Sequence, residues 1–153
     1  MNGGDRARQG SRRQNGPPTP SSGRAASILI VDDVEDSREM YAEYLRYKGY
    51  IVETATDGRD GLARALEMAP DTIVLDLTMP GIDGLEALRQ LRRHSVTSHA
   101  LLIVVTGHAL KGTREQAMKA GADVFLTKPC LPDELEAAIT AQHARRGNTP
   151  PRR

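Results

Sequence analysis

The polar side chains that could do chemistry in this 153-residue chain each follow a short apolar segment. They are Asp32 and Asp33, Asp76, Thr106 and Lys128. Three carboxylates that meet in one place repel one another, and a divalent cation with oxygen ligands relieves that repulsion. Mg²⁺ fits better than zinc, because no His or Cys is placed as a ligand. The ammonium and hydroxyl groups complete a set suited to phosphoryl transfer, with Asp76 as the nucleophile.

Each of these residues alone also has an ordinary structural explanation. An aspartate that precedes a helix commonly caps it. Asp76, within the stretch IVLDLTMPGIDG at 73–84, could form an Asx-turn before Pro80. A single lysine is most often a solvated surface residue. The chemical interpretation therefore depends on whether the fold brings the five residues together.

Five short apolar segments alternate with patterns of helical period. Four segments are rich in Val, Ile and Leu, which is typical of parallel strands covered on both faces. The segment at 50–53 is more polar and indicates an edge strand. Apolar residues at 62–69 follow a helical repeat that Pro70 stops, and Thr113 with Gln116 has the capping-box spacing of a helix start. The predicted strands are 28–31, 50–53, 72–75, 101–105 and 123–126.

The regular alternation of strand and helix predicts an α/β fold. Right-handed crossovers and an edge-like second strand favour a flavodoxin-like, doubly wound sheet of five parallel strands in the order 2-1-3-4-5, with five helices. Ligands bind such sheets beyond the carboxyl ends of the strands, where the strand order reverses. In this order the reversal lies between the first and third strands, which end at Asp32 and Asp76.

Composition and charge divide the chain into a globular body and two tails. The body at 27–141 has a net charge of −7, whereas residues 1–26 and 142–153 each carry +4. The tails are poor in apolar residues, so we expect both to be disordered and basic. An acidic body is a poor nucleic-acid binder, although binding through the tails is an alternative. No output domain is expected after residue 141, which favours a stand-alone domain.

Targeting signals are not evident in the sequence. The longest apolar run, at 100–105, is too short to cross a bilayer, and the Arg- and Pro-rich N-terminus does not resemble a secretory signal. The single Cys130 cannot form an internal disulfide, which suits a reducing compartment. We therefore expect a cytoplasmic protein without membrane contact.

Four motifs in this order resemble the response-regulator receiver domain of two-component signalling: ILIVDDVEDS, IVLDLTMPGIDGLEAL, LIVVTGHA and GADVFLTKP. The resemblance covers about residues 27–141. It implies that Asp76 is the phospho-acceptor and a ligand of Mg²⁺. It also implies that Asp33 binds the ion directly, that Asp32 acts partly through water, and that the backbone carbonyl of Thr78 completes the metal site.

The resemblance assigns further roles around the acceptor. Thr106 resembles the switch hydroxyl that binds the phosphoryl group, and Lys128 the lysine that pairs with acceptor and phosphate. The peptide bond before Pro129 is typically cis in the family. Phe125 occupies the switch-aromatic position but lacks the hydroxyl of the frequent tyrosine. The two positions that tune phosphoryl lifetime hold Thr78 and His108, and Gly107 stands where alanine is frequent.

The function implied is that of a signalling phospho-acceptor rather than an enzyme, with at most self-phosphorylation and self-dephosphorylation. A histidine kinase or phosphotransfer protein would phosphorylate Asp76. The face made by the fourth helix, fifth strand and fifth helix would then repack and bind an unknown protein target or a second copy, or the phosphoryl group would pass onward.

Three rival functions are weighed against the receiver interpretation. A haloacid-dehalogenase-like phosphatase needs a second Asp where Thr78 stands. A flavodoxin-type FMN protein would not place four acids in its phosphate loop, as DDVEDS does here. A receiver fold used only for docking does not need the complete set of acids, Thr106 and Lys128.

Overall fold

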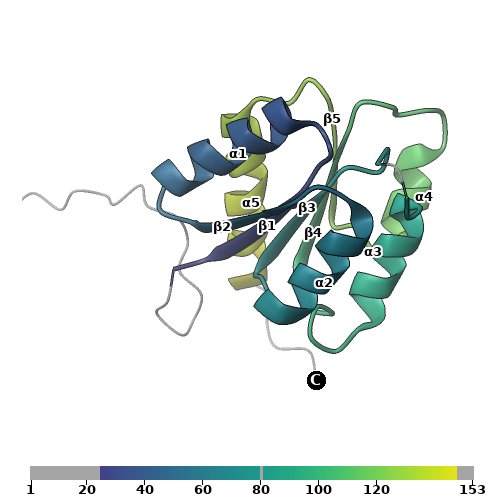
Figure 1. The fold of residues 1–153 in the computed structure, drawn as a ribbon, viewed down its shortest axis with the longest axis horizontal. Coiled ribbons are helices and arrows are strands. Elements are labelled where there is room, and N and C mark those ends of the chain that lie inside the picture. Colours follow the sequence, from purple (N-terminus) through teal and green to yellow (C-terminus); the bar gives the residue numbers. More distant parts are fainter. Residues whose placement is uncertain (1–24, 80, 148–153) are drawn as a thin grey trace, which may run out of the picture.

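The computed structural model describes residues 25–79 and 81–147, in which five parallel strands form one sheet in the order β2-β1-β3-β4-β5 (Figure 1). The predicted fold class and strand order are therefore confirmed. The second and fifth strands each start one residue later than predicted. The strands are β1 (Ser27–Val31), β2 (Ile51–Ala55), β3 (Thr72–Leu75), β4 (Leu101–Thr106) and β5 (Val124–Thr127).

Five helices cover the two faces of the sheet (Figure 1). One face packs against α1 and α5, and the other against α2, α3 and α4. Among the described residues, no helix is both long enough and apolar enough to cross a membrane. The helices are α1 (Glu35–Tyr47), α2 (Gly58–Met68), α3 (Gly84–Arg93), α4 (Thr113–Ala120) and α5 (Pro132–Gly147).

Two apolar clusters hold these layers together. Every residue of β1, β3 and β4 is buried, because helices cover both faces of these central strands. The outer strand β2 alternates between exposed and buried residues, as its more polar sequence predicts. On one face the cluster includes Tyr41 and Leu45 of α1 with Leu135 and Ile139 of α5. The central strands are therefore covered on both faces, and their carboxyl ends lie at one edge of the sheet.

Aspartate side chains cap the starts of α2 and α3, whereas the N-cap residues of α1 and α4, Val34 and Gly112, make no side-chain cap. Asp57 accepts a hydrogen bond from the backbone of Asp60 and starts α2. The helix α4 begins at Thr113, as predicted, but the capping-box explanation is wrong. The N-cap residue is Gly112, at φ 87°, and it has no side-chain cap. Thr113 is instead the first residue of the helix, so its hydroxyl is not in the N-cap position.

The C-terminal boundary differs from the one expected at residue 141. Helix α5 continues to Gly147, so the first half of the expected tail is helical. Arg146 explains part of this extension, because it donates to the carbonyl of His99 and to the Asp123 carboxylate. The rest of the expected tails, at 1–24 and 148–153, and Pro80 lie outside the described residues.

Candidate functional site

The register of the central strands brings two buried aspartates to one edge of the sheet. Val31 pairs with Leu75, so the next residues, Asp32 and Asp76, leave neighbouring strands side by side. The Asp76 amide also donates to the Val31 carbonyl at 3.1 Å. The side chains of both aspartates are almost wholly buried, whereas Asp33 is exposed. The site thus has a buried floor and one solvent-facing carboxylate.

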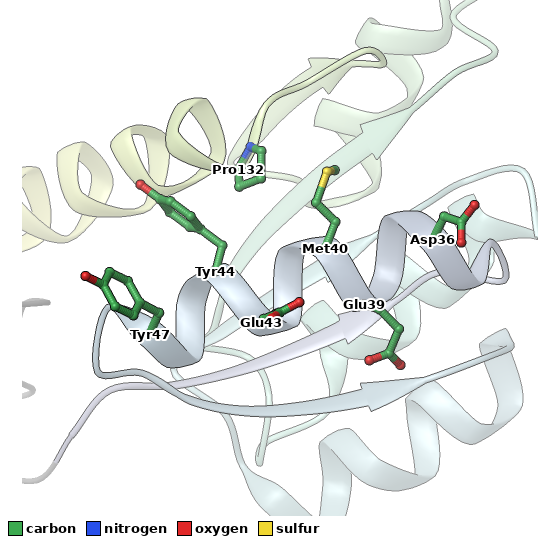
Figure 2. A pocket seen from close by; sticks show the side chains of 7 residues that line it. All are labelled: Asp36, Glu39, Met40, Glu43, Tyr44, Tyr47 and Pro132. Carbon is green, nitrogen blue, oxygen red and sulfur yellow. The ribbon is translucent and has the colours of Figure 1, made fainter.

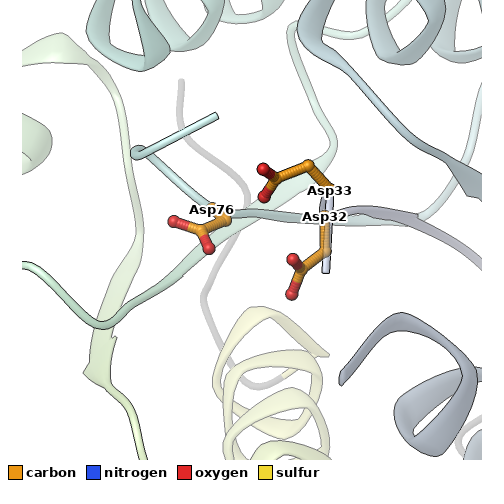
Figure 3. A group of neighbouring side chains, drawn as sticks. All are labelled: Asp32, Asp33 and Asp76. Carbon is orange, nitrogen blue, oxygen red and sulfur yellow. The ribbon is translucent and has the colours of Figure 1, made fainter. Parts of the chain in front are cut away.

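One carboxylate oxygen from each of Asp32, Asp33 and Asp76 lies within 4.8 Å of the other two (Figure 3). Among the residues that the structure describes, none forms a hydrogen bond or ion pair with the Asp33 carboxylate. Hard oxygen donors, with one of them open to solvent, suit Mg²⁺, which keeps several waters and takes one or two carboxylates. The residues present therefore fit the ion that the sequence predicts.

Lys128 lies against the buried side of this acid cluster. Its Nζ is 2.9 Å from Oδ2 of Asp32 and 3.0 Å from Oδ2 of Asp76. The lysine amide donates to the Thr106 carbonyl at 2.9 Å, which ties the end of β5 to the end of β4. The Lys128–Pro129 peptide bond is cis. One ammonium group therefore bridges the two buried carboxylates, which would otherwise repel each other.

The contacts of Asp76 and Lys128 favour the charged form of both groups. Burial alone would raise the pKa of Asp76, but hydrogen bonds from Thr78 and Lys128 outweigh it, and the pKa lies below its ordinary value. Burial would likewise lower the pKa of Lys128, but its bonds to Asp32 and Asp76 outweigh that and raise the pKa. Asp76 is therefore a carboxylate at neutral pH, as a nucleophile must be.

Thr78 contacts the acceptor candidate in a way that the sequence did not predict. Its amide and its Oγ1 both donate to Oδ1 of Asp76, at 2.9 Å and 2.8 Å. The hydrogen bond from the Thr78 amide to the side chain of Asp76, two residues earlier, forms an Asx-turn. This is the turn that was considered as an ordinary structural explanation for Asp76. Turn and reactive-site interpretations are therefore compatible, because Oδ1 forms the turn while Oδ2 binds Lys128.

The other predicted site residues are arranged around this centre. Thr106 ends β4 and is fully buried, and its Oγ1 lies 3.4 Å from the His108 amide. Phe125 is partly buried and packs against the core cluster on the face covered by α2, α3 and α4. The structure describes His108 as an exposed loop residue. These contacts show where Thr106, Phe125 and His108 lie, but they do not by themselves assign a chemical role to any of them.

Two neighbours of the site were missed by sequence reasoning. Arg38 of α1 donates to the Asp32 carbonyl at 3.1 Å. Tyr41 donates to the Cys130 carbonyl at 2.7 Å and ties α1 to the segment after Lys128; burial raises the pKa of this phenol to about 12. Both Arg38 and Tyr41 lie in the amphipathic helix α1, but no sequence pattern predicts these contacts. Burial also raises the pKa of the Cys130 thiol, which disfavours the reactive thiolate.

Comparison with known proteins agrees with this geometry. Residues 28–140 match the sequence pattern of the response regulator receiver domain. The chain belongs to the response regulator receiver domain family. Receiver domains accept phosphoryl groups from histidine kinases in two-component signalling and bind Mg²⁺ at an acidic pocket. The family membership excludes the haloacid-dehalogenase and flavodoxin alternatives as explanations of this domain.

Relatives of the receiver domain are regulators from several bacteria. It is 40% identical to the response regulator PleD of Caulobacter vibrioides over 105 residues, 69% of this chain and 23% of that protein. It is 35% identical to the transcriptional regulatory protein ResD of Bacillus subtilis over 122 residues, 80% of this chain and 50% of that protein. The chain thus spans about a quarter to a half of these relatives, so their other activities do not transfer to it.

Solved structures show the same fold. A CheY-like receiver domain protein from Methanospirillum hungatei superposes with a TM-score of 0.76 at 27% identity, over 81% of this chain and 98% of that chain. The chemotaxis response regulator CheY4 of Vibrio cholerae gives a TM-score of 0.69 at 30% identity, over 80% of this chain and 98% of that chain. The receiver domain therefore has a fold found across distant organisms.

Proposed function

We propose that this receiver domain takes a phosphoryl group onto Asp76 from a histidine kinase or a histidine phosphotransfer protein. The observation that carries the proposal is the pairing of a buried, ionised Asp76 with Lys128, beside the carboxylates of Asp32 and Asp33. A cytoplasmic location is part of the proposal, because response regulators are usually cytoplasmic.

An oxygen of Asp76 attacks the phosphorus, and a new oxygen–phosphorus bond forms as the donor's nitrogen–phosphorus bond breaks. The electron pair of the broken bond stays on the donor imidazole. Asp76 needs no base, because its lowered pKa leaves it ionised at neutral pH. Lys128, already 3.0 Å from Oδ2, neutralises charge on the acceptor and its new phosphoryl group.

Asp33, Asp32 and Asp76 would hold Mg²⁺, with the Thr78 carbonyl as a further ligand. When bound, the ion stabilises negative charge on the transferring phosphoryl oxygens. The exposed Asp33 faces solvent, the side from which an ion with its waters arrives. The Asp32 carboxylate also accepts a hydrogen bond from the Val34 amide at 2.9 Å. This bond orients the carboxylate before any ion binds.

We propose that movements of Thr106 and Phe125 transmit the phosphorylation signal to the surface of the domain. Thr106 turns its hydroxyl toward the phosphoryl group, and Phe125, only partly buried, moves into the space vacated. The face of α4, β5 and α5 then repacks and presents a surface to a protein target or to a second copy, or the phosphoryl group passes onward. Phe125 lacks a hydroxyl, so this movement proceeds without a hydrogen bond from its ring. Thr78 and His108 are proposed to tune the lifetime of the phosphoryl group.

Incubation of the full chain with acetyl phosphate and Mg²⁺ tests the proposal. Intact-protein mass spectrometry should show the addition of one phosphoryl group, and chelation of Mg²⁺ should abolish it. Asp33→Asn should slow the uptake strongly. Asp83→Asn is the matched control, because this aspartate caps α3 and is not part of the acid cluster. Equal uptake with and without the metal would contradict the proposal.

A further inference from the structure

A groove of about 650 Å³ runs along α1, on the side that faces the start of α5 (Figure 2). Its lining combines carboxylates with apolar and aromatic side chains. The helix α1 supplies all of these residues except one proline at the start of α5. The lining residues are Asp36, Glu39, Met40, Glu43, Tyr44, Tyr47 and Pro132.

The apolar part of this lining is open to solvent in the described chain. Tyr47 is 85% exposed and Met40 is 41% exposed. Large exposed apolar groups that lie together commonly mark a binding surface. Among the described residues, three carboxylates and no basic side chain line the same groove, so the surface suits an occupant with both apolar and cationic groups.

One contact, made by a residue that does not itself line the groove, places a cation over a lining ring. The Lys48 ammonium lies over the Tyr44 ring, 5.7 Å from its centroid. Tyrosine rings attract arginine in the same way. Aromatic grooves also bind extended proline-rich segments, whose conformation is ordered before binding. The groove therefore has the chemistry to hold a segment that contains both prolines and arginines.

The chain itself carries such a segment, and it enters the fold beside the groove. Residues 1–24 hold five arginines and one acid, and the stretch RRQNGPPTP occupies 12–20. The Ile51 amide donates to the Ala26 carbonyl at 3.0 Å, so the start of β1 lies beside the turn that follows Tyr47. Figure 1 shows the start of β1 and the last turn of α1 at the same end of the domain.

We propose that residues 12–20 dock in this groove, with the prolines on Tyr44 and Tyr47 and the paired arginines near Glu39 and Asp36. From Asp36 to Tyr47 the helix rises about 17 Å, at about 1.5 Å per residue. A polyproline II segment rises about 3.1 Å per residue, so about six residues span that length. Four residues, 21–24, would then connect the docked stretch to Ala25, the first described residue. The inference does not depend on phosphorylation of Asp76.

Paramagnetic broadening in the full chain tests this docking. The buried Cys130 is replaced by alanine, and a nitroxide is attached through Ser11→Cys in uniformly ¹⁵N-labelled protein. Docking predicts selective broadening of amides at 36–47 and little effect on α2. Glu39→Lys with Glu43→Lys should remove the broadening, whereas Glu67→Lys with Glu115→Lys, exposed positions on α2 and α4, should leave it.

Two further experiments show whether the docked segment belongs to the same chain and control for an effect of the Cys130 replacement. In a mixture of ¹⁵N-labelled protein without nitroxide and unlabelled protein with it, broadening at 36–47 would show docking between copies and overturn the intramolecular proposal. In the chain with native Cys130, Arg12→Glu with Arg13→Glu should shift the α1 amides and leave α2 unmoved. Unchanged α1 resonances there, or broadening that survives reversal of Glu39 and Glu43, would also overturn it.

Discussion

Thr78 donates two hydrogen bonds to the same oxygen of Asp76, from its amide at 2.9 Å and from its hydroxyl at 2.8 Å. The other oxygen of Asp76 accepts from Lys128 at 3.0 Å. The two oxygens of the proposed acceptor thus have separate partners, one in the turn and one at the end of β5. This arrangement holds the carboxylate still and ionised before a donor arrives.

Removal of the Thr78 hydroxyl should raise the pKa of Asp76. Thr78→Val keeps the shape of the side chain and the hydrogen bond from the backbone amide, but it deletes the hydroxyl donor to Oδ1. Hydrogen bonds donated to a carboxylate favour its ionised form. A ¹³C NMR titration of the Asp76 carboxyl measures the change. Thr78→Ser, which retains the hydroxyl, is the matched control and should stay near the wild-type value. An unchanged pKa in the valine variant would contradict the role assigned to this bond.

Replacement by alanine should have opposite effects on stability at two glycines near the site. A Cβ on Gly84 would lie 2.7 Å from the Leu77 Cα and 2.8 Å from its carbonyl oxygen, so the backbone beside Asp76 would have to move. We expect Gly84→Ala to cost about 1–3 kcal/mol of unfolding free energy and to slow phosphorylation. A Cβ on Gly107 meets only Lys128 carbons at 3.9 Å, an ordinary contact.

Gly107→Ala should therefore be tolerated, and should stabilise the fold by about 0.4–1 kcal/mol because the unfolded chain loses conformational freedom. Urea denaturation of both variants measures the difference. If Gly84→Ala were as stable as Gly107→Ala, the close approach of α3 to the acceptor loop would not be a constraint.

Lys128→Met should destabilise the domain, because it leaves the buried Asp32 and Asp76 carboxylates without their shared cation. Loss of one partner of a buried pair costs about 3 kcal/mol. Mg²⁺ should then stabilise the variant more than the wild type, since it would supply the missing charge. Urea denaturation with and without Mg²⁺ measures both effects. The exposed Lys119→Met on α4 is the control, and an equal loss there would contradict this explanation.

His143 should make stability depend on pH in the mildly acidic range. Burial, and next the charge of Arg146, lower the pKa of this imidazole below its ordinary 6.5. Its Nε2 lies 3.1 Å from the buried Thr72 hydroxyl. Below pH 6.5 the unfolded chain binds a proton that the folded chain resists, so stability falls as the pH falls toward the folded-state pKa.

Urea denaturation between pH 7.5 and about 5 tests this effect. His143→Gln keeps a polar partner for Thr72 and should flatten the slope. His108→Gln, on an exposed loop, should keep the wild-type slope. Parallel curves for the wild type and His143→Gln would show that His143 is not responsible.

The fold could be predicted because its signals are local and repeated. Buried parallel strands leave uninterrupted runs of aliphatic residues, and the polar character of β2 marks an edge. The meeting of Asp32, Asp33, Asp76 and Lys128 followed from topology, since parallel strands end at the same edge. These predictions needed only the order of the strands.

The remaining details depend on three-dimensional packing that no local pattern records. The Thr78 hydroxyl bond depends on a side-chain rotamer, and the extension of α5 to Gly147 depends on Arg146 reaching Asp123, 23 residues away in sequence. The capping-box pattern at Thr113 failed because Gly112, in the left-handed region, is the N-cap residue. Met40 lies within α1, yet it lines a groove instead of the core, and this depends on how α1 packs in the fold.

The most direct test of the central claim is to map the modified residue after phosphorylation. The full chain is treated with acetyl phosphate and Mg²⁺, the acyl phosphate is reduced with borohydride to homoserine, and peptides are sequenced by mass spectrometry. We predict homoserine at position 76, and none in Asp76→Asn treated in the same way. Homoserine at Asp32, Asp33, Asp71 or Asp83 with Asp76 unmodified, or equal labelling of the Asp76→Asn variant, would contradict the account.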